Sequence, residues 1–133
     1  MNSRDRFFAT IHGEPIDRVP VCPISMMAAA DLIGAAYVAY ATDYRAQVNG
    51  QVAFATEFDI DHVSAISDPA TEAADWGAPV VYYLDQPPAL NESDALLKDK
   101  LALSRLTPPK PDTGRRMSNR LRVVESLRSE VGY

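Results

Sequence analysis

Cysteine and long apolar runs are both scarce in this sequence, and each scarcity narrows the class of protein. Cys22 is the single cysteine among 133 residues, so no disulfide can form within the chain and we expect a reducing compartment. The longest apolar stretch, residues 26–41, is interrupted by Asp31 and Gly34 and is too short and too polar to span a membrane. The first six residues lack the apolar core of a signal peptide. These observations predict a cytoplasmic protein that does not associate with a membrane.

An excess of basic residues is also missing. The 13 Lys and Arg residues are outnumbered by 18 Asp and Glu residues, which gives a net charge of −5 at pH 7 and argues against a general nucleic-acid-binding protein. A charge run late in a sequence usually forms the solvated face of a helix, with anion binding as the alternative. Five arginines form such a run here: Arg115, Arg116, Arg120, Arg122 and Arg128.

Histidine is scarce as well, and the sequence predicts no metal site. His12 and His62 are the two histidines, and their spacing relative to Cys22 matches no zinc motif. We also find no glycine-rich phosphate-binding loop and no nucleophile elbow.

Proline, by contrast, is frequent, and the ten prolines punctuate the expected elements. Apolar runs bounded by turn residues predict strands at residues 19–24, 62–66 and 78–84. Helical spacing and capping signals predict helices at residues 3–12, 26–33, 43–58, 69–76, 93–106 and from 117 to the C-terminus. In this scheme Gly13 ends the first helix, Thr42 caps the third, and Asp68 caps the fourth with Pro69 in its first turn.

Strands that alternate with helices favour an α/β fold with a few mostly parallel strands. Three strands cannot close a barrel, and parallel strands are normally covered on both faces. Open strand edges and apolar faces favour association. We therefore expect the isolated chain to form a homo-oligomer, to associate through its open sheet edges, or to be poorly stable.

Four segments, found in order along the sequence, carry a family resemblance. The first is residues 4–23, which contain Gly-Glu-Pro-Ile-Asp-Arg-Val-Pro-Val at residues 13–21, and the second is Phe-Asp-Ile-Asp-His-Val at residues 58–63. The third is Ile-Ser-Asp at residues 66–68 with Glu72-Ala73 and Trp76-Gly77, and the fourth is Pro-Lys-Pro-Asp at residues 109–112 with Gly-Arg-Arg-Met at residues 114–117. Together they resemble the N-terminal part of the uroporphyrinogen decarboxylase superfamily. That family implies a TIM (β/α)8 barrel, which needs about 250 residues. The resemblance therefore implies that residues 1–133 are a single partial domain, a fragment from the N-terminal side of such a barrel.

The enzyme to which this segment belongs could come from either of two branches of the superfamily, the decarboxylases or the methyltransferases. The decarboxylases carry an arginine-rich segment after the first strand that holds the substrate's carboxylates, whereas residues 25–34 of this sequence contain no arginine. A porphyrinogen with many carboxylates needs cationic partners. The sequence therefore favours the methyltransferase branch, in which a methyl group passes between cobalamin and a thiol. Uroporphyrinogen decarboxylase activity in porphyrin biosynthesis is the alternative.

The methyltransferase branch implies a corrinoid, a corrinoid-protein partner, and a zinc ion that lowers the pKa of the thiol. The zinc ligands of that branch lie later in the barrel and have no counterpart in this sequence, so this chain alone is expected to bind no cofactor. A third reading is a non-catalytic module that binds a tetrapyrrole or corrinoid ligand or a partner protein. Whether the chain alone is an enzyme stays open.

The resemblance also points to five candidate site residues. Asp68 matches the decarboxylase aspartate that faces the cleft and accepts hydrogen bonds from pyrrole N–H groups, a task that suits a carboxylate; a helix N-cap is an equally good reading. Ser67 precedes it as a substrate-binding candidate. Ser25, Met26 and Met27 follow the first strand, where barrel active sites gather, although the methionines could instead pack in the core.

Two further expectations concern structure alone. Cys22 lies inside an apolar run, where a free thiol usually behaves as a small buried hydrophobe. Asp17 and Arg18 are expected to form a local ion pair that fixes the turn before the first strand.

Overall fold

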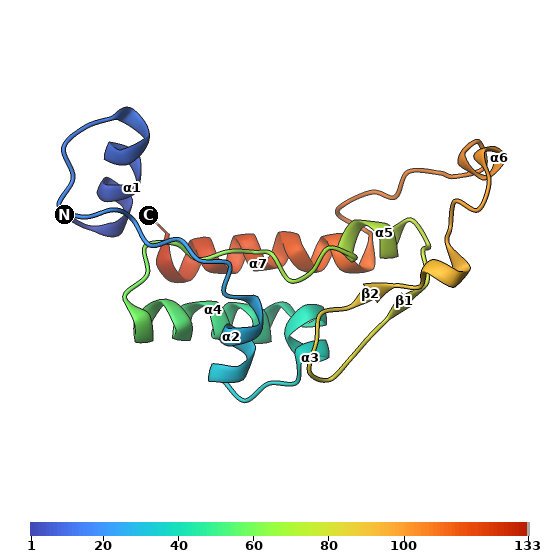
Figure 1. Ribbon diagram of the computed structural model, residues 1–133, viewed down its shortest axis with the longest axis horizontal. Coiled ribbons are helices and arrows are strands. Elements are labelled where there is room, and N and C mark those ends of the chain that lie inside the picture. The colour runs from blue at the N-terminus through green and yellow to red at the C-terminus, as the bar shows by residue number, and fades with distance from the viewer. Residues whose placement is uncertain (133) are drawn as a thin grey trace.

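The protein is mainly helical, and a computed structural model describes residues 1–132 (Figure 1). Its α-helices are α1 (Ser3–His12), α2 (Met26–Leu32), α3 (Tyr37–Thr42), α4 (Tyr44–Phe58), α5 (Thr71–Asp75), α6 (Lys100–Leu103) and α7 (Arg115–Val131). A 3₁₀ helix, η1 (Glu92–Asp94), and two strands, β1 (Val80–Val81) and β2 (Ala89–Leu90), complete the described elements. Over this range no helix is both long enough and apolar enough to cross a membrane.

Capping signals explain why α1 forms where the sequence predicts it. Asn2 is the N-cap, and its side-chain oxygen accepts a hydrogen bond of 2.8 Å from the Asp5 amide. Gly13 ends the helix with a φ of 71°, a left-handed conformation that glycine adopts without strain. The prediction of α1 is confirmed, and α2 also forms as predicted, one residue shorter.

The long helix α4 forms as predicted but with a different cap. Thr42 is the last residue of α3, a helix that the sequence did not predict, and its hydroxyl donates to the Val38 carbonyl at 2.6 Å. The N-cap of α4 is Asp43, whose carboxylate accepts a hydrogen bond of 2.9 Å from the Arg45 amide. The assignment of Thr42 as the cap is therefore wrong, because the neighbouring carboxylate takes that role.

Two predicted helices are shorter than expected. α5 begins two residues late, because the chain first turns over the Asp68 carboxylate, which accepts a hydrogen bond of 3.0 Å from the Ala70 amide. The expected helix at residues 93–106 is reduced to η1 and α6. Asn91 and Asp99 each cap one of these short helices, so two competing starts replace one continuous helix.

The core lies between α2, α3 and α4. Its buried residues are Ala29, Ala30, Tyr37, Tyr40 and Ala41, with Met26 and Phe54 packed against them. A Cβ atom at Gly50 of α4 would lie 2.9 Å from both the Ala29 carbonyl oxygen and the Tyr40 ring. This close approach of α2 and α4 explains a glycine in mid-helix, where its intrinsic cost is about 1 kcal/mol relative to alanine.

Residues 19–24 are extended but do not form a strand. Two of these six residues are prolines, which have no amide hydrogen to donate. The Val21 amide donates instead to the carboxylate of Asp61 at 2.8 Å, and the Asp61 amide donates to the Val21 carbonyl at 2.9 Å. Cys22 is exposed in this segment, so the prediction of a buried thiol in a strand is wrong.

Residues 62–66 are likewise extended without a ladder, because side chains take their amide hydrogens. The Ser64 amide donates to Gln51 Oε1 at 2.8 Å, and the Ile66 amide donates to Ser64 Oγ at 3.1 Å. The strand expected at residues 78–84 is reduced to β1, which pairs antiparallel with β2. Within residues 1–132 this antiparallel pair is the sole sheet, so the prediction of parallel strands is wrong.

The direction of the chain nevertheless alternates as in a β/α unit. In Figure 1 both extended segments run from the end of the molecule that holds the termini toward the end that holds α5, and α4 and α7 run back. The two helices lie side by side at their starts, where the Tyr44 amide of α4 donates to Asn119 Oδ1 of α7 at 2.8 Å. The described residues thus contain two segment-and-helix units and no closed barrel.

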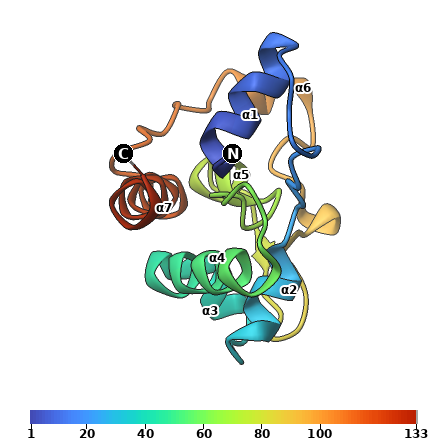
Figure 2. The same ribbon diagram turned by 90° about the vertical axis from the view of Figure 1, so that its left-hand side faces the viewer.

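A buried arginine attaches α1 to the rest of the chain. Figure 2 shows α1 standing apart from the group formed by α2, α3 and α4. Arg6 of α1 is 7% exposed and pairs with the two carboxylate oxygens of Asp17 at 2.7 and 2.8 Å and with Asp61 at 2.5 Å. Arg18 pairs with Asp61, so the expected Asp17–Arg18 ion pair is wrong: each partner finds a group from elsewhere in the chain.

This network shifts the pKa values of its carboxylates downward. Hydrogen bonds from Arg6 hold the pKa of Asp17 well below its ordinary value, against an opposing effect of burial. Burial opposes the ionised form of Asp61 too, but hydrogen bonds from the Val21 amide and from the two arginines outweigh it, and the pKa of Asp61 is also lowered.

Candidate functional site

Asp68 ends the extended segment at residues 62–67, and its carboxylate is fully enclosed by protein. The residue is 2% exposed. Its Oδ1 atom accepts the hydrogen bond from Ala70, and its Oδ2 atom accepts hydrogen bonds from the Ser67 hydroxyl at 2.7 Å and from the Arg116 guanidinium at 2.5 Å. Asp68 therefore orders the turn before α5 and forms a buried ion pair with α7.

Arg116, in the first turn of α7, joins three separate parts of the chain. It is 4% exposed, and besides Asp68 it donates to the Ala41 carbonyl of α3 at 3.1 Å and to the Tyr82 hydroxyl at 3.2 Å. Its guanidinium carbon lies 5.6 Å from the centroid of the Tyr82 ring, within the range of a cation–π contact. We call the group formed around this arginine the Asp68 cluster: Ser67, Asp68, Thr71, Tyr82 and Arg116.

The position of Arg116 is set by an N-terminal cap supplied from another helix. The Asp75 carboxylate of α5 accepts hydrogen bonds from the Arg116 amide at 3.0 and 3.1 Å and from the Met117 amide at 2.7 Å. A carboxylate at this position satisfies amides that have no partner within the helix and complements the helix dipole. The start of α7 is therefore fixed against α5.

Arg120 lies one turn further along α7 and approaches the same turn of α5. It donates to the Thr71 hydroxyl at 3.0 Å and pairs with Glu72 at 2.5 Å. The Nε atoms of Arg116 and Arg120 are buried and have no hydrogen-bond partner among the described residues. Two guanidinium groups thus pair with the carboxylates of Asp68 and Glu72.

Ser67 is held from both sides. Its hydroxyl donates to Asp68, and its carbonyl accepts a hydrogen bond of 2.5 Å from the Tyr37 hydroxyl. Burial raises the pKa of Tyr37 above its ordinary value, and the nearby Tyr40 and Asp68 raise it further. Tyr37 therefore stays a neutral hydrogen-bond donor that links α3 to the Asp68 cluster.

Ser25 belongs to a different buried network. It is 4% exposed, and its hydroxyl oxygen accepts a hydrogen bond of 3.1 Å from Gln51 Nε2, which also donates to the Tyr40 hydroxyl at 2.7 Å. Burial raises the pKa of Tyr40, although the hydrogen bond from Gln51 opposes this shift. The network anchors the start of α2 on α4.

The two methionines differ in their surroundings. Met26 packs against the core of α2, α3 and α4, whereas Met27 is 43% exposed. Of the five sequence-predicted site residues, hydrogen bonds therefore bring together Ser67 and Asp68, while Ser25 and Met26 are joined to other groups.

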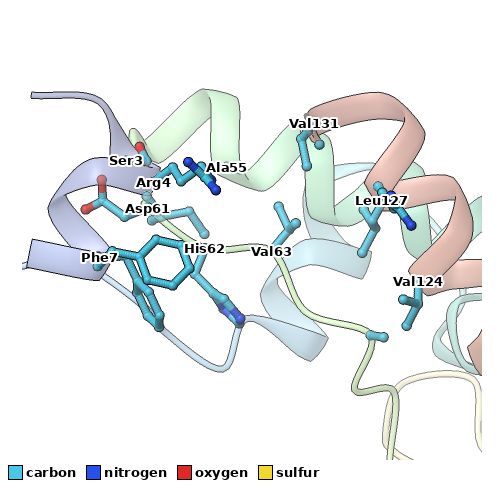
Figure 3. A pocket seen from close by; sticks show the side chains of 15 residues that line it. Ser3, Arg4, Phe7, Ala55, Asp61, His62, Val63, Val124, Leu127 and Val131 are labelled. Carbon is cyan, nitrogen blue, oxygen red and sulfur yellow. The ribbon is translucent and has the colours of Figure 1, made fainter. Parts of the chain in front are cut away.

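Two apolar grooves open elsewhere on the surface. One, of about 540 Å³, lies between α1, residues 60–65 and the end of α7, with Phe7, Val63, Leu127 and Val131 on its walls (Figure 3). The other, of about 550 Å³, lies beside Trp76 and is lined by leucines before, within and after α6, among them Leu97, Leu103 and Leu106. Neither groove is lined by a member of the Asp68 cluster.

No metal centre is formed by the part of the chain that the structure describes. Within residues 1–132 no group of three or more His, Cys, Asp or Glu side chains is placed to hold a metal ion. His62 is exposed. The zinc ion of the methyltransferase branch does not fit these residues, and we derive no step through it.

Sequence reasoning missed Arg116 and Tyr82. The charge run of late arginines predicts a solvated helix face, yet Arg116 is buried and Arg120 is half-buried. Their spacing of four residues, which places two side chains on one face of a helix, was the available signal. Tyr82 carried none, because its partner lies 34 residues away.

The chain belongs to the uroporphyrinogen decarboxylase (URO-D) family, because the model of that family matches residues 2–133. We found no match among curated proteins. Among solved structures, a methyltransferase from Methanosarcina mazei superposes with a TM-score of 0.70 and 19% sequence identity. The match covers 100% of this chain and 40% of that one, so the chain spans less than half the length of this structural relative. At this identity the likeness shows a shared fold.

Proposed function

We propose that this chain is the N-terminal part of a URO-D-family enzyme with a TIM (β/α)8 barrel, and that the enzyme catalyses cobalamin-linked methyl transfer to a thiol. The proposal assigns the chain the first two segment-and-helix units of the barrel. It places the ligand at the end of the molecule where Asp68 and the start of α7 meet, since barrel active sites lie at the carboxyl ends of the strands.

The observation that carries the choice of branch is the absence of cations from the segment that follows the first extended segment. Residues 25–34, which form α2 and its C-terminal turn, contain no arginine or lysine. Arg116 and Arg120 do lie nearby, but they pair with Asp68 and Glu72. A substrate with many carboxylates would leave its charges without partners here, whereas a corrinoid with neutral amide side chains would not. The structural likeness to a methyltransferase supports the same choice.

Two alternatives stand beside this proposal. The family name itself favours uroporphyrinogen decarboxylation as the competing activity. A non-catalytic role, in which the chain binds a corrinoid, a corrinoid protein or a second chain, is favoured by the exposed apolar residues on the extended segments. We also infer a cytoplasmic location, because the single cysteine suits a reducing compartment.

The test compares two substrates with the full-length enzyme that contains this chain, because the proposal assigns the chain only the first part of the barrel. In one arm, methylcobalamin, a zinc salt and a thiol are added, and methyl transfer is followed by the loss of the methylcobalamin absorption band. In the other arm, uroporphyrinogen is added and carboxyl loss is followed by chromatography. Binding of hydroxocobalamin is measured separately by isothermal titration calorimetry, so that binding and turnover are distinguished.

Each outcome selects one reading. Binding with methyl transfer supports the proposal, and binding without turnover supports the non-catalytic module. Carboxyl loss from uroporphyrinogen would establish the decarboxylase instead. Absence of binding in every arm would contradict both the methyltransferase and the corrinoid-binding readings for this chain.

A further inference from the structure

We propose that residues 91–109, which we call the leucine arm, form a lid that closes against Trp76 at the end of α5 and buries the second apolar groove. The arm carries η1 and α6, and Figure 1 shows it leaving the rest of the molecule beyond α5. A lid at this end can admit a ligand when open and exclude water when closed. The movement involves this chain alone, so it does not depend on the activity proposed above.

The groove separates two apolar walls that belong to different parts of the chain. One wall is formed by α5 and the residues that follow it, among them Ala73, Trp76 and Pro79. The other wall is formed by leucines of the arm: Leu96, Leu97, Leu103 and Leu106. Since the space between the walls amounts to about 550 Å³, they face one another without being packed together.

Both walls leave apolar side chains in water. Leu97 and Leu103 of the arm are 52% and 62% exposed, and Trp76 on the opposite wall is 36% exposed. A movement of the arm toward α5 removes this surface from water, and the hydrophobic effect therefore favours closure.

No polar contact holds the arm away from α5. Within residues 1–132, the hydrogen bonds and the ion pair of residues 92–109 all stay inside the arm. The arm is fixed at its ends instead, where the Asn91 amide donates to the Pro79 carbonyl at 2.9 Å and the Gly114 amide donates to the Lys110 carbonyl at 2.8 Å. Closure therefore breaks no hydrogen bond to the rest of the chain, and a segment anchored at both ends can move as a lid.

The test is acrylamide quenching of the fluorescence of Trp76, the single tryptophan of the chain. In the wild-type chain, closure should protect Trp76 from the quencher. Leu97→Ser and Leu103→Ser should each shift the ratio of closed to open arm about tenfold toward the open form, the factor expected for burial of one leucine side chain, and should increase quenching. Leu101→Ser is the matched control, because Leu101 lies on α6 with Leu103 and is 70% exposed but does not line the groove.

A distance measurement supplies a second readout. An acceptor dye is attached to Leu101→Cys in a Cys22→Ser background, which leaves one thiol in the chain, and energy transfer from Trp76 is measured. Transfer should be more efficient in this labelled chain than in the same chain carrying Leu103→Ser in addition.

The outcomes separate closure of the arm from its alternatives. Protection of Trp76 that is independent of protein concentration, lost in Leu97→Ser and Leu103→Ser and kept in Leu101→Ser supports closure. Equal quenching in the wild type and all the serine variants, or energy transfer unchanged by Leu103→Ser, would overturn it. Protection that disappears on dilution would overturn it as well, because a second copy of the chain would then fill the groove.

Discussion

The Asp61 side chain is enclosed by hydrogen-bond donors that come from different parts of the sequence. Its oxygens accept hydrogen bonds from Arg6, Arg18 and the Val21 amide, and its side chain is 0% exposed. Asp61→Asn keeps the shape but removes the charge that the arginines face. We expect the free energy of unfolding at pH 7 to fall by about 1–3 kcal/mol, measured by urea denaturation.

Asp59→Asn is the matched control for this substitution. The Asp59 side chain is 95% exposed and 3.5 Å from Arg18, so its ion pair should contribute little. Its φ of 48° is tolerated equally by asparagine. Equal losses in the two variants would contradict the role given to Asp61.

The same network predicts acid lability. The pKa values of Asp17 and Asp61 are lowered in the folded protein, so the unfolded chain binds more protons once the pH falls below about 5, near the unfolded aspartate value of about 4. Stability should be constant from pH 7 to 5 and should fall steadily below pH 4. In urea titrations across this range, the deficit of Asp61→Asn should shrink as the pH falls; a deficit that grows would refute the assignment.

Asp68 shows which properties of a single residue can be predicted from the sequence and which cannot. The prediction that Asp68 is the N-cap of a helix starting at Pro69 is wrong, because α5 begins at Thr71 with Ala70 as its N-cap, and the Asp68 carboxylate orders the turn before it instead. Its ion pair with Arg116 was not foreseen, because the two residues are 48 positions apart and their contact depends on how α5 meets α7. The ligand-contacting role of Asp68 stays a prediction.

At the scale of elements, the start of α7 depends on a close approach. A Cβ atom at Gly114 would lie 2.4 Å from the carboxylate oxygen of Asp75 that caps the helix. Gly114→Ala should therefore displace the cap and lower the free energy of unfolding by about 0.5–2 kcal/mol, as measured by thermal denaturation. In an Asp75→Ala background the same change should cost nothing further; a full additional loss would show that Gly114 acts in another way.

Helices were predicted better than strands, for a local reason. The ends of α1 are marked by Asn2 and Gly13, residues whose conformational preferences act within a few positions. A strand exists only when another strand supplies hydrogen bonds, and residues 19–24 and 62–66 donate their amides to side chains instead. Their apolar sequence pattern correctly predicts an extended backbone, but no local signal indicates whether a second strand lies beside it.

At the scale of the whole molecule, the extended segments leave large apolar side chains in water. Val19, Ile24 and Ile66 are 74%, 74% and 47% exposed. Exposed apolar surface next to open edges favours association. The structural relative is long enough to cover such faces within one chain, since this chain matches 40% of it.

We therefore expect the isolated chain to associate. Light scattering after size-exclusion chromatography should give a mass above the 14.6 kDa of one chain, increasing with concentration. Val19→Ser and Ile24→Ser should each lower that mass, because they reduce the apolar area removed from water in the complex. Leu101→Ser is the control, since Leu101 is 70% exposed on α6, outside the extended segments. A stable monomer at every concentration, or an equal effect of Leu101→Ser, would show that these segments are not the surface through which the chain associates.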